Sequence, residues 1–204
     1  MKCTKIRSAF LLVVLPLCVL VCVSGSESAR AEIIGTADLS GAQEVPPNAS
    51  NATGYATMDL DPESGIFDLT LVVEGLTVAD LAEVGPNDSP VHIHLAPEGV
   101  NGGVVVDLGF QGVLYDGVDN FLLLVDGGTF GGPQGGINSD IETNIDALLS
   151  GHLYINVHTD AIPGGEIRGQ ISATDLTVPE PTSGVLGMIV LVSVAGLRFI
   201  VWRG

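Results

Sequence analysis

HLYINVHTDAIPGGEIRGQI, residues 152–171, reads as a strand, a turn and a second strand. In the first strand, Leu153, Ile155 and Val157 alternate with polar residues. Because successive side chains of a strand point to opposite faces, these three residues form one apolar face. The opposite face collects the polar side chains His152, Tyr154, Asn156 and His158. The stretch therefore predicts a strand whose histidines are kept apart from its aliphatic side chains.

A second strand carries histidines in the same way. In PVHIHL, residues 90–95, Val91, Ile93 and Leu95 share one face. His92 and His94 share the other face. With a rise of ~3.3 Å per residue, the two imidazoles start about 7 Å apart, and both can turn onto one ion.

These histidines predict a metal site if the two strands lie close together. Three imidazoles, from His92, His94 and His158, suit one Cu or Zn ion. Glu166, on the following strand, would be a fourth ligand or would orient one imidazole. The alternative is a hydrogen-bonded polar patch that pins the strands together, with Arg168 neutralising Glu166. Both interpretations stay open on the sequence alone.

The rest of the body also favours strands, because its apolar period from residue 33 to 172 is mostly two. Residues 55–60 and 67–73 alternate on either side of the turn DPESG and predict a hairpin. The acids Asp59, Asp61 and Glu63 raise the alternative of a calcium loop, but Pro62 explains the turn without a metal. Further strands are expected at 91–95, 104–108, 121–125, 152–158 and 166–171.

One short helix is expected before residue 151. Asn138 or Ser139 can cap it, and Gly151 can end it. Its apolar stripe consists of Ile141, Ile145, Leu148 and Leu149. Short antiparallel strands with Gly and Pro turns and a single helix predict an all-β fold, an antiparallel β-sandwich.

The charge of the body is strongly negative. Between residues 32 and 178 there are 22 Asp or Glu residues against a single Arg and no Lys. Such a surface repels nucleic acid, so we expect no nucleic-acid partner.

All three cysteines lie within the first 22 residues. A metal site in the body must therefore use His, Asp or Glu.

Both ends of the chain look like targeting segments. Residues 1–31 have a basic start, an apolar run from Ala9 to Val23 and an Ala-Arg-Ala site, which predicts a signal peptide. Residues 176–184 form a Pro-containing linker, and residues 185–204 predict a C-terminal transmembrane helix. The tail, with Pro179-Glu180-Pro181 before an apolar span and a basic end, resembles the PEP-CTERM sorting signal. That resemblance implies export to the cell envelope or surface of a Gram-negative bacterium, processing by an exosortase-type enzyme, and membrane tethering or release. A plain membrane anchor is the alternative.

The body, residues 32–175, resembles the CHRD domain, first described in chordin. The resemblance rests on three blocks in the family's order: LSGAQEVPPNASNATG (39–54), VHIHLAPEGVNGGVVVDL (91–108) and LLSGHLYINVHTDAIPGGEIRGQI (148–171). It implies an immunoglobulin-like all-β domain and little about activity. The family's recurring polar positions fall on Glu44, His92, His94, Asn156, His158, Glu166, Arg168 and Gln170. Of these, Glu44, Asn156, Arg168 and Gln170 are expected to form a structural polar network.

Two functions follow as expectations. The first is an exported, non-enzymatic binding or structural module, with extracellular polysaccharide as a candidate partner. The sequence shows no G-x-S-x-G motif and singles out no catalytic residues. The second is a Cu- or Zn-binding metalloprotein, in which redox activity would require an open coordination position.

Overall fold

The computed structural model describes residues 31–131 and 140–176. Nearly all of the predicted signal peptide, and the predicted apolar C-terminal segment, lie outside these residues. No helix among the described residues is long and apolar enough to cross a membrane.

Ten antiparallel strands lie within the described residues, so the all-β prediction is confirmed. Their bounds are β1 Ile33–Ser40, β2 Thr53–Asp61, β3 Ile66–Glu74, β4 Val91–Leu95, β5 Gly103–Asp107, β6 Val113–Asp116, β7 Asn120–Thr129, β8 Leu153–Val157, β9 Ile167–Gln170 and β10 Ser172–Asp175. The order across the sheet is β5-β4-β8-β9-β1-β2-β3-β7-β6, with β10 paired to β1. Every expected strand is present, and β1, β6 and β10 are additional.

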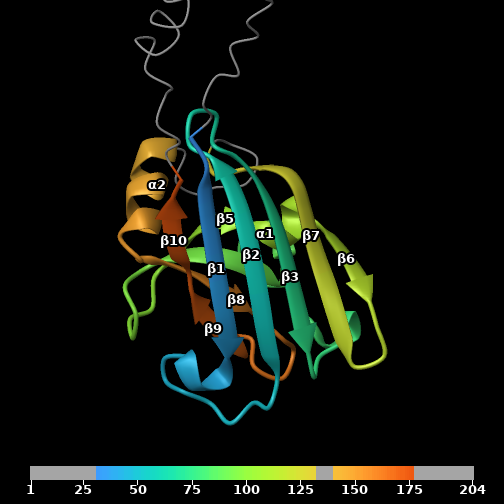
Figure 1. Ribbon diagram of the computed structural model, residues 1–204. Coiled ribbons are helices and arrows are strands. Elements are labelled where there is room, and N and C mark those ends of the chain that lie inside the picture. The colour runs from blue at the N-terminus through green and yellow to red at the C-terminus, as the bar shows by residue number, and fades with distance from the viewer. Residues whose placement is uncertain (1–30, 132–139, 177–204) are drawn as a thin grey trace, which may run out of the picture.

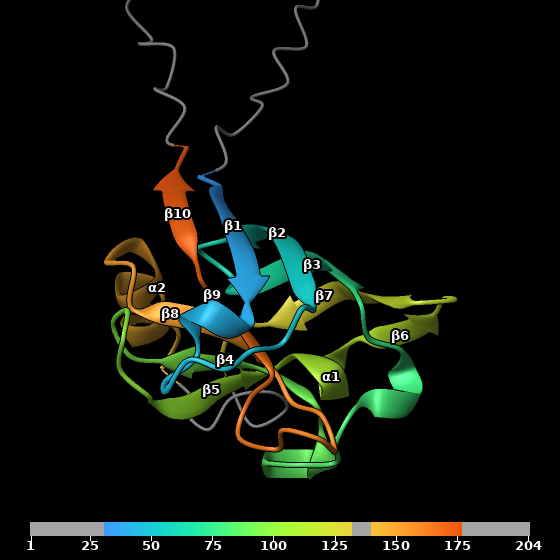
Figure 2. The ribbon, with the colours of Figure 1, turned by 90° about the horizontal axis from the view of Figure 1, so that it is seen from below.

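The strands form one curled, sandwich-like sheet (Figures 1 and 2). The half with β4, β5 and β8 lies across from the half with β2 and β3. Strand β1 joins the two halves, because it pairs with β2 along its length while Ser40 pairs with Arg168 of β9. The curl places the apolar faces of both halves against a common core.

The alternation of buried and exposed side chains along the strands determines which residues form the hydrophobic core. On β3, Phe67, Leu69, Leu71 and Val73 are buried, and the residues between them are exposed. On β8, Leu153, Ile155 and Val157 reach the same core. Their polar neighbours Tyr154 and Asn156 are buried as well, so β8 is covered on both faces. The second covered face is where the histidines lie.

Two helices and three 3₁₀ turns complete the described chain. Helix α2 spans Ile141–Leu149, buries Leu148 and is capped by Asp140, whose side chain accepts from the N–H of Thr143. The predicted caps Asn138 and Ser139 fall outside the described residues. Helix α1, Leu108–Gln111, begins where β5 ends, because Asp107 accepts a hydrogen bond from the N–H of Phe110. The 3₁₀ turns are Gly41–Gln43, Val78–Asp80 and Pro86–Asp88.

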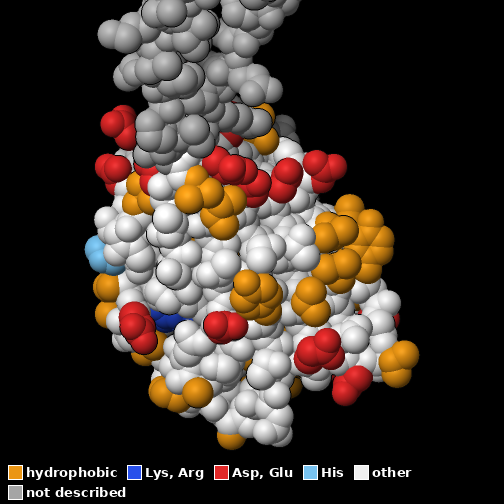
Figure 3. Space-filling view, viewed as in Figure 1, with side chains coloured by type: hydrophobic (Ala, Val, Ile, Leu, Met, Phe, Trp, Pro, Cys, Tyr) orange, Lys and Arg blue, Asp and Glu red, His pale blue; other side chains and the backbone are white. Residues whose placement is uncertain are grey.

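The two ends of the described chain lie side by side. Ile33 of β1 pairs with Asp175 of β10, and the N–H of Leu176 donates to the carbonyl of Glu32. Figure 3 shows acidic side chains across the visible face, with apolar patches between them. Arg168 is the single Lys or Arg among the described residues, and it is buried.

Candidate metal centre

Strand pairing brings the three predicted histidine ligands together. Strands β4 and β8 are neighbours, with His92 opposite Asn156 and His94 opposite Tyr154. His158 follows β8 directly, and its backbone N–H donates to the carbonyl of Pro90 at 2.8 Å. The condition that the sequence left open, that the two histidine-bearing strands be adjacent, is therefore met.

The three rings form a compact cluster. The ring centroid of His92 lies 5.7 Å from that of His94 and 5.2 Å from that of His158. The centroids of His94 and His158 are 5.8 Å apart. One ring nitrogen from each histidine lies within 4.8 Å of the other two. All three side chains are buried, with exposed fractions of 1%, 8% and 7% for His92, His94 and His158.

Hydrogen bonds fix which nitrogen of two rings faces the cluster. Nδ1 of His94 lies 3.0 Å from the carbonyl oxygen of Gly102. Nδ1 of His158 lies 3.0 Å from the carbonyl oxygen of Pro163. Because a carbonyl only accepts, each Nδ1 carries the proton and donates. The Nε2 atoms of both rings therefore hold a free lone pair, and both are buried without a hydrogen-bond partner.

His92 is held by packing. Both of its ring nitrogens are buried without a hydrogen-bond partner. The backbone of Gly85, at φ 68°, lies against the ring, and a Cβ there would sit 2.9 Å from Cε1 of His92. Asp107 lies opposite His92 on β5. Neither Gly85 nor Asp107 was singled out from the sequence, because their proximity to His92 depends on chain register and on a loop.

Burial keeps the three imidazoles neutral at pH 7. Desolvation lowers the pKa of His92 to about 4, and the nearby His158 lowers it too, whereas Asp107 raises it. Desolvation also lowers the pKa of His94 to about 4, against the hydrogen bond to Gly102. The pKa of His158 is likewise lowered by burial. Neutral imidazole is the form that binds a metal ion.

Glu166 lies outside this group. One of its carboxylate oxygens accepts from the hydroxyl of Ser50, and the other accepts from the hydroxyl of Thr159. The carboxylate of Glu166 therefore ties the segment after β1 to the loop that follows His158. Its contact with that loop makes it a candidate for positioning His158.

Arg168 and Gln170 form the predicted polar network around Tyr154. The guanidinium carbon of Arg168 lies 3.4 Å from the ring centroid of Tyr154, and that ring stacks on His94 with centroids 5.0 Å apart. Arg168 donates to the carbonyls of Val100 and Pro97. Gln170 donates to the carbonyls of Ala96 and Gly151 and accepts from Arg168. The network anchors the loop between β4 and β5 behind His94.

Glu44 and Asn156 are the remaining members of the predicted network. Both side chains are buried, and one oxygen of each has no hydrogen-bond partner. They meet at Gly165, where a Cβ would sit 2.7 Å from Oε1 of Glu44 and 2.6 Å from Nδ2 of Asn156. Burial raises the pKa of Glu44 to about 7, against the positive charge of Arg168.

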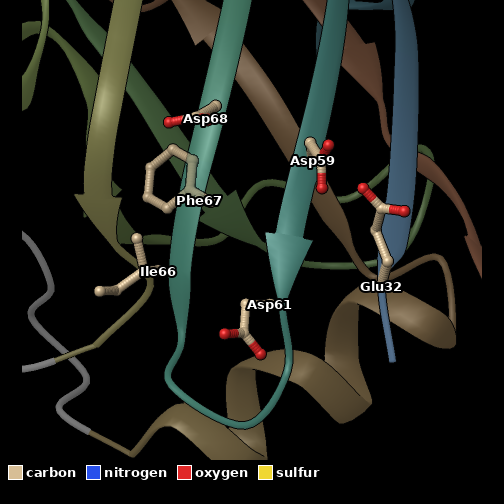
Figure 4. Close-up of a pocket in the computed structure, with 6 residues that line it drawn as sticks. All are labelled: Glu32, Asp59, Asp61, Ile66, Phe67 and Asp68. Atoms are coloured by element: carbon tan, nitrogen blue, oxygen red, sulfur yellow. The ribbon is translucent and has the colours of Figure 1, made fainter. Parts of the chain in front are cut away.

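An acidic pocket on the opposite half of the sheet includes two residues of the calcium alternative. Figure 4 shows Glu32, Asp59, Asp61 and Asp68 around it. Asp61 accepts from the N–H of Glu63 and the hydroxyl of Ser64, which are bonds within the turn. Among the described residues, the three histidines are the one set of three or more such side chains whose ligand atoms converge. The acids of this pocket do not form such a set.

One of three comparisons with known proteins gives a match. The CHRD domain family matches residues 35–171, which is most of the chain. Searches of curated proteins and of solved structures give no match. On the match over residues 35–171, the chain belongs to the CHRD domain family.

Proposed function

We propose that this CHRD domain binds one transition-metal ion through His92, His94 and His158. The observation that carries the proposal is the convergence of three buried imidazoles, each of which has at least one ring nitrogen without a hydrogen-bond partner. A buried polar atom without a partner costs about 1–3 kcal/mol. A bound metal ion would satisfy one nitrogen on each ring at once.

The competing interpretation is a hydrogen-bonded polar patch. In such a patch the ring nitrogens would bond to one another or to neighbouring side chains. Instead, the partnered nitrogens of His94 and His158 donate outward to backbone carbonyls. Fixing one nitrogen of a histidine through a hydrogen bond to the other is typical of metal ligands.

The proposed activity is binding, with no chemical step assigned. The three histidines would hold the ion, and the carbonyls of Gly102 and Pro163 would fix the ring orientations. Tyr154 would support the ring of His94 from behind. An imidazole-bound ion can serve structure, storage or transfer, and the domain is proposed to act as a non-enzymatic metal-binding module.

Metal content is the direct test. The full chain, produced without a histidine tag, is loaded with Cu or Zn, washed and measured by elemental analysis. We expect about one ion per chain, lost in His94→Ala. His152→Ala is the matched control, because His152 is the fourth histidine, is exposed and lies outside the cluster. Equal metal content in the two variants, or none in the unmodified protein, would contradict the proposal.

We also propose that the module is exported and held at the cell envelope. The support is the signal-peptide pattern of residues 1–31 and the PEP-CTERM-like tail of residues 176–204. Because the described chain begins and ends at paired residues, both flanking segments attach at one place on the domain. An exosortase-type enzyme and extracellular polysaccharide are the proposed partners. Deleting residues 178–204 should move the protein from the envelope fraction to the medium or periplasm, and unchanged fractionation would contradict this assignment.

A further inference from the structure

The donor set of the histidine cluster is neutral and has three members. His94 and His158 each keep a proton on Nδ1 and offer Nε2, so neither supplies negative charge. No Asp or Glu oxygen among the described residues converges with the three ring nitrogens. A thiolate is ruled out for this part of the chain, because all cysteines lie within the first 22 residues.

Two carboxylates beside the cluster, those of Asp107 and Glu166, are engaged in other hydrogen bonds. Asp107 accepts from the N–H of Phe110 with one oxygen and from the side chain of Asn87 with the other. Both oxygens of Glu166 accept from hydroxyl groups. Recruiting either carboxylate as a fourth ligand would break hydrogen bonds that hold the loops around the cluster.

The surroundings disfavour a high charge on the ion. The cost of burying an ion grows with the square of its charge, so a dication costs about four times as much as a monocation. The guanidinium of Arg168 lies 3.4 Å from the ring centroid of Tyr154, and the other neighbour of that ring is His94, so the guanidinium places a positive electrostatic field near this imidazole. The same field would disfavour each additional positive charge on an ion bound at His94.

We propose that the cluster selects monovalent copper, held by three imidazole nitrogens. This rests on the proposed metal binding and deepens it. Zn²⁺ in proteins takes four ligands, and here it would need a water or an external ligand as the fourth. Cu(I), a closed-shell monocation, is stable with three nitrogen ligands, which matches both the number and the neutrality of the donors.

The experiment compares oxidation states at the same site. The full chain is loaded without oxygen with one equivalent of Cu(I), then exposed to air, and Cu(II) is quantified by electron paramagnetic resonance. We expect less than about a tenth of the bound copper to become Cu(II), and X-ray absorption to show three nitrogen neighbours. Full conversion to Cu(II), or four or more nitrogen and oxygen neighbours, would overturn the preference for Cu(I) while leaving metal binding intact. Failure to retain either copper or zinc would overturn both proposals.

A variant with an added negative charge tests whether the local charge causes the preference for Cu(I). Asn156 lies opposite His92 on the neighbouring strand, so Asn156→Asp introduces a carboxylate beside the cluster. We expect at least a tenfold rise in the air-oxidised fraction of the copper. Thr57→Asp adds the same charge at an exposed position of β2 and should leave that fraction unchanged. Equal fractions in the two folded variants would show that local charge does not set the preference. If Asn156→Asp does not fold, the air-oxidation measurement on the unmodified protein still decides the proposal.

Discussion

Position 165 requires glycine, because the neighbouring side chains leave no room for a Cβ. Its φ is 128°, and a Cβ there would lie 2.6–2.7 Å from the amide of Asn156 and from Oε1 of Glu44. Gly165→Ala therefore combines backbone strain with a steric clash, and we expect it to lower the free energy of unfolding by about 1–3 kcal/mol. Gly164→Ala is the control, because a Cβ at Gly164 meets nothing within 4 Å. Urea unfolding measures both, and an equal loss in the two variants would contradict the packing at Gly165.

Glu44 should make stability fall as the pH rises. Its pKa is about 7 in the folded protein, against 4.5 as the ordinary value. Between these values the folded state holds more protons than the unfolded state, so its stabilisation is complete below pH 4.5 and is lost as the pH rises through 7. We expect a loss on the order of 1–2 kcal/mol over this range, after allowance for solvent screening.

The variant Glu44→Gln should remove this pH dependence. Urea unfolding of the metal-free protein at several pH values between 4.5 and 8 gives the unfolding free energy of the variant and of the unmodified chain, and their difference reports the contribution of Glu44. Glu83→Gln, at an exposed position, is the control and should follow the unmodified protein. A pH profile for Glu44→Gln that matches the unmodified protein would show that Glu44 titrates normally.

At the residue scale, sequence reasoning found the site members that alternate along a strand. His92 and His94 share a face for that reason, as do Tyr154, Asn156 and His158. It could not find Gly85 or Gly165, whose roles depend on loops that fold against distant side chains. Nor could it place Glu166, because the two hydroxyls that hold its carboxylate, those of Ser50 and Thr159, belong to loops.

Strand β8 is the element on which both the core and the candidate site depend. Ile155 on its apolar face is 2% exposed, while Tyr154 and Asn156 face the polar network. We expect Ile155→Ala to cost about 2–5 kcal/mol of unfolding free energy, because it leaves a cavity in a packed core. Val72→Ala, at a site 40% exposed on the outer face of β3, should cost less than about 1 kcal/mol. Chemical unfolding of the two variants tests this, and similar losses would place Ile155 outside the tightly packed core.

At the element scale, period-two alternation predicted β2 and β3 and the apolar stripe predicted α2, whereas the eight-residue strand β1 was not predicted. Strands β6 and β10 are four residues each, and β10 has no apolar alternation that would mark it. These two segments are strands because they hydrogen-bond to longer neighbours: β10 pairs with β1, and β6 pairs with β7. The end of β5 was predicted one residue late, because Leu108 fits the alternation but the side chain of Asp107 caps α1.

At the scale of the whole molecule, the sequence could not order the strands. The order β5-β4-β8-β9-β1 joins segments from both ends of the domain, and the β4–β8 pairing within it places His158 beside His92. The histidine cluster is thus a product of long-range pairing. Its stability should therefore be tied to that of the entire sheet, since opening the β4–β8 pair would separate the ligands.

Because the histidine cluster forms only in the folded sheet, protonation of its imidazoles should favour unfolding, so we expect the metal-free domain to be sensitive to acid. The pKa values of His92 and His94 are about 4 in the folded state against 6.5 ordinarily, and that of His158 is also lowered. Between pH 4 and 6.5 the unfolded state binds more protons, so the stabilisation is complete above pH 6.5 and is lost as the pH falls through 4. Glu44 acts in the opposite direction over part of this range, but one carboxyl opposes three imidazoles.

We expect the three histidines to remove on the order of 3 kcal/mol or more of unfolding free energy between pH 6.5 and 4. The measurement is urea unfolding in the presence of a chelator, at pH values from 4 to 7.5. His94→Gln should make the pH dependence shallower, because one buried imidazole no longer titrates, whereas His152→Gln changes only the exposed histidine and should leave it unaltered. If both variants kept the slope of the unmodified protein, the buried cluster would not be the origin of the acid sensitivity.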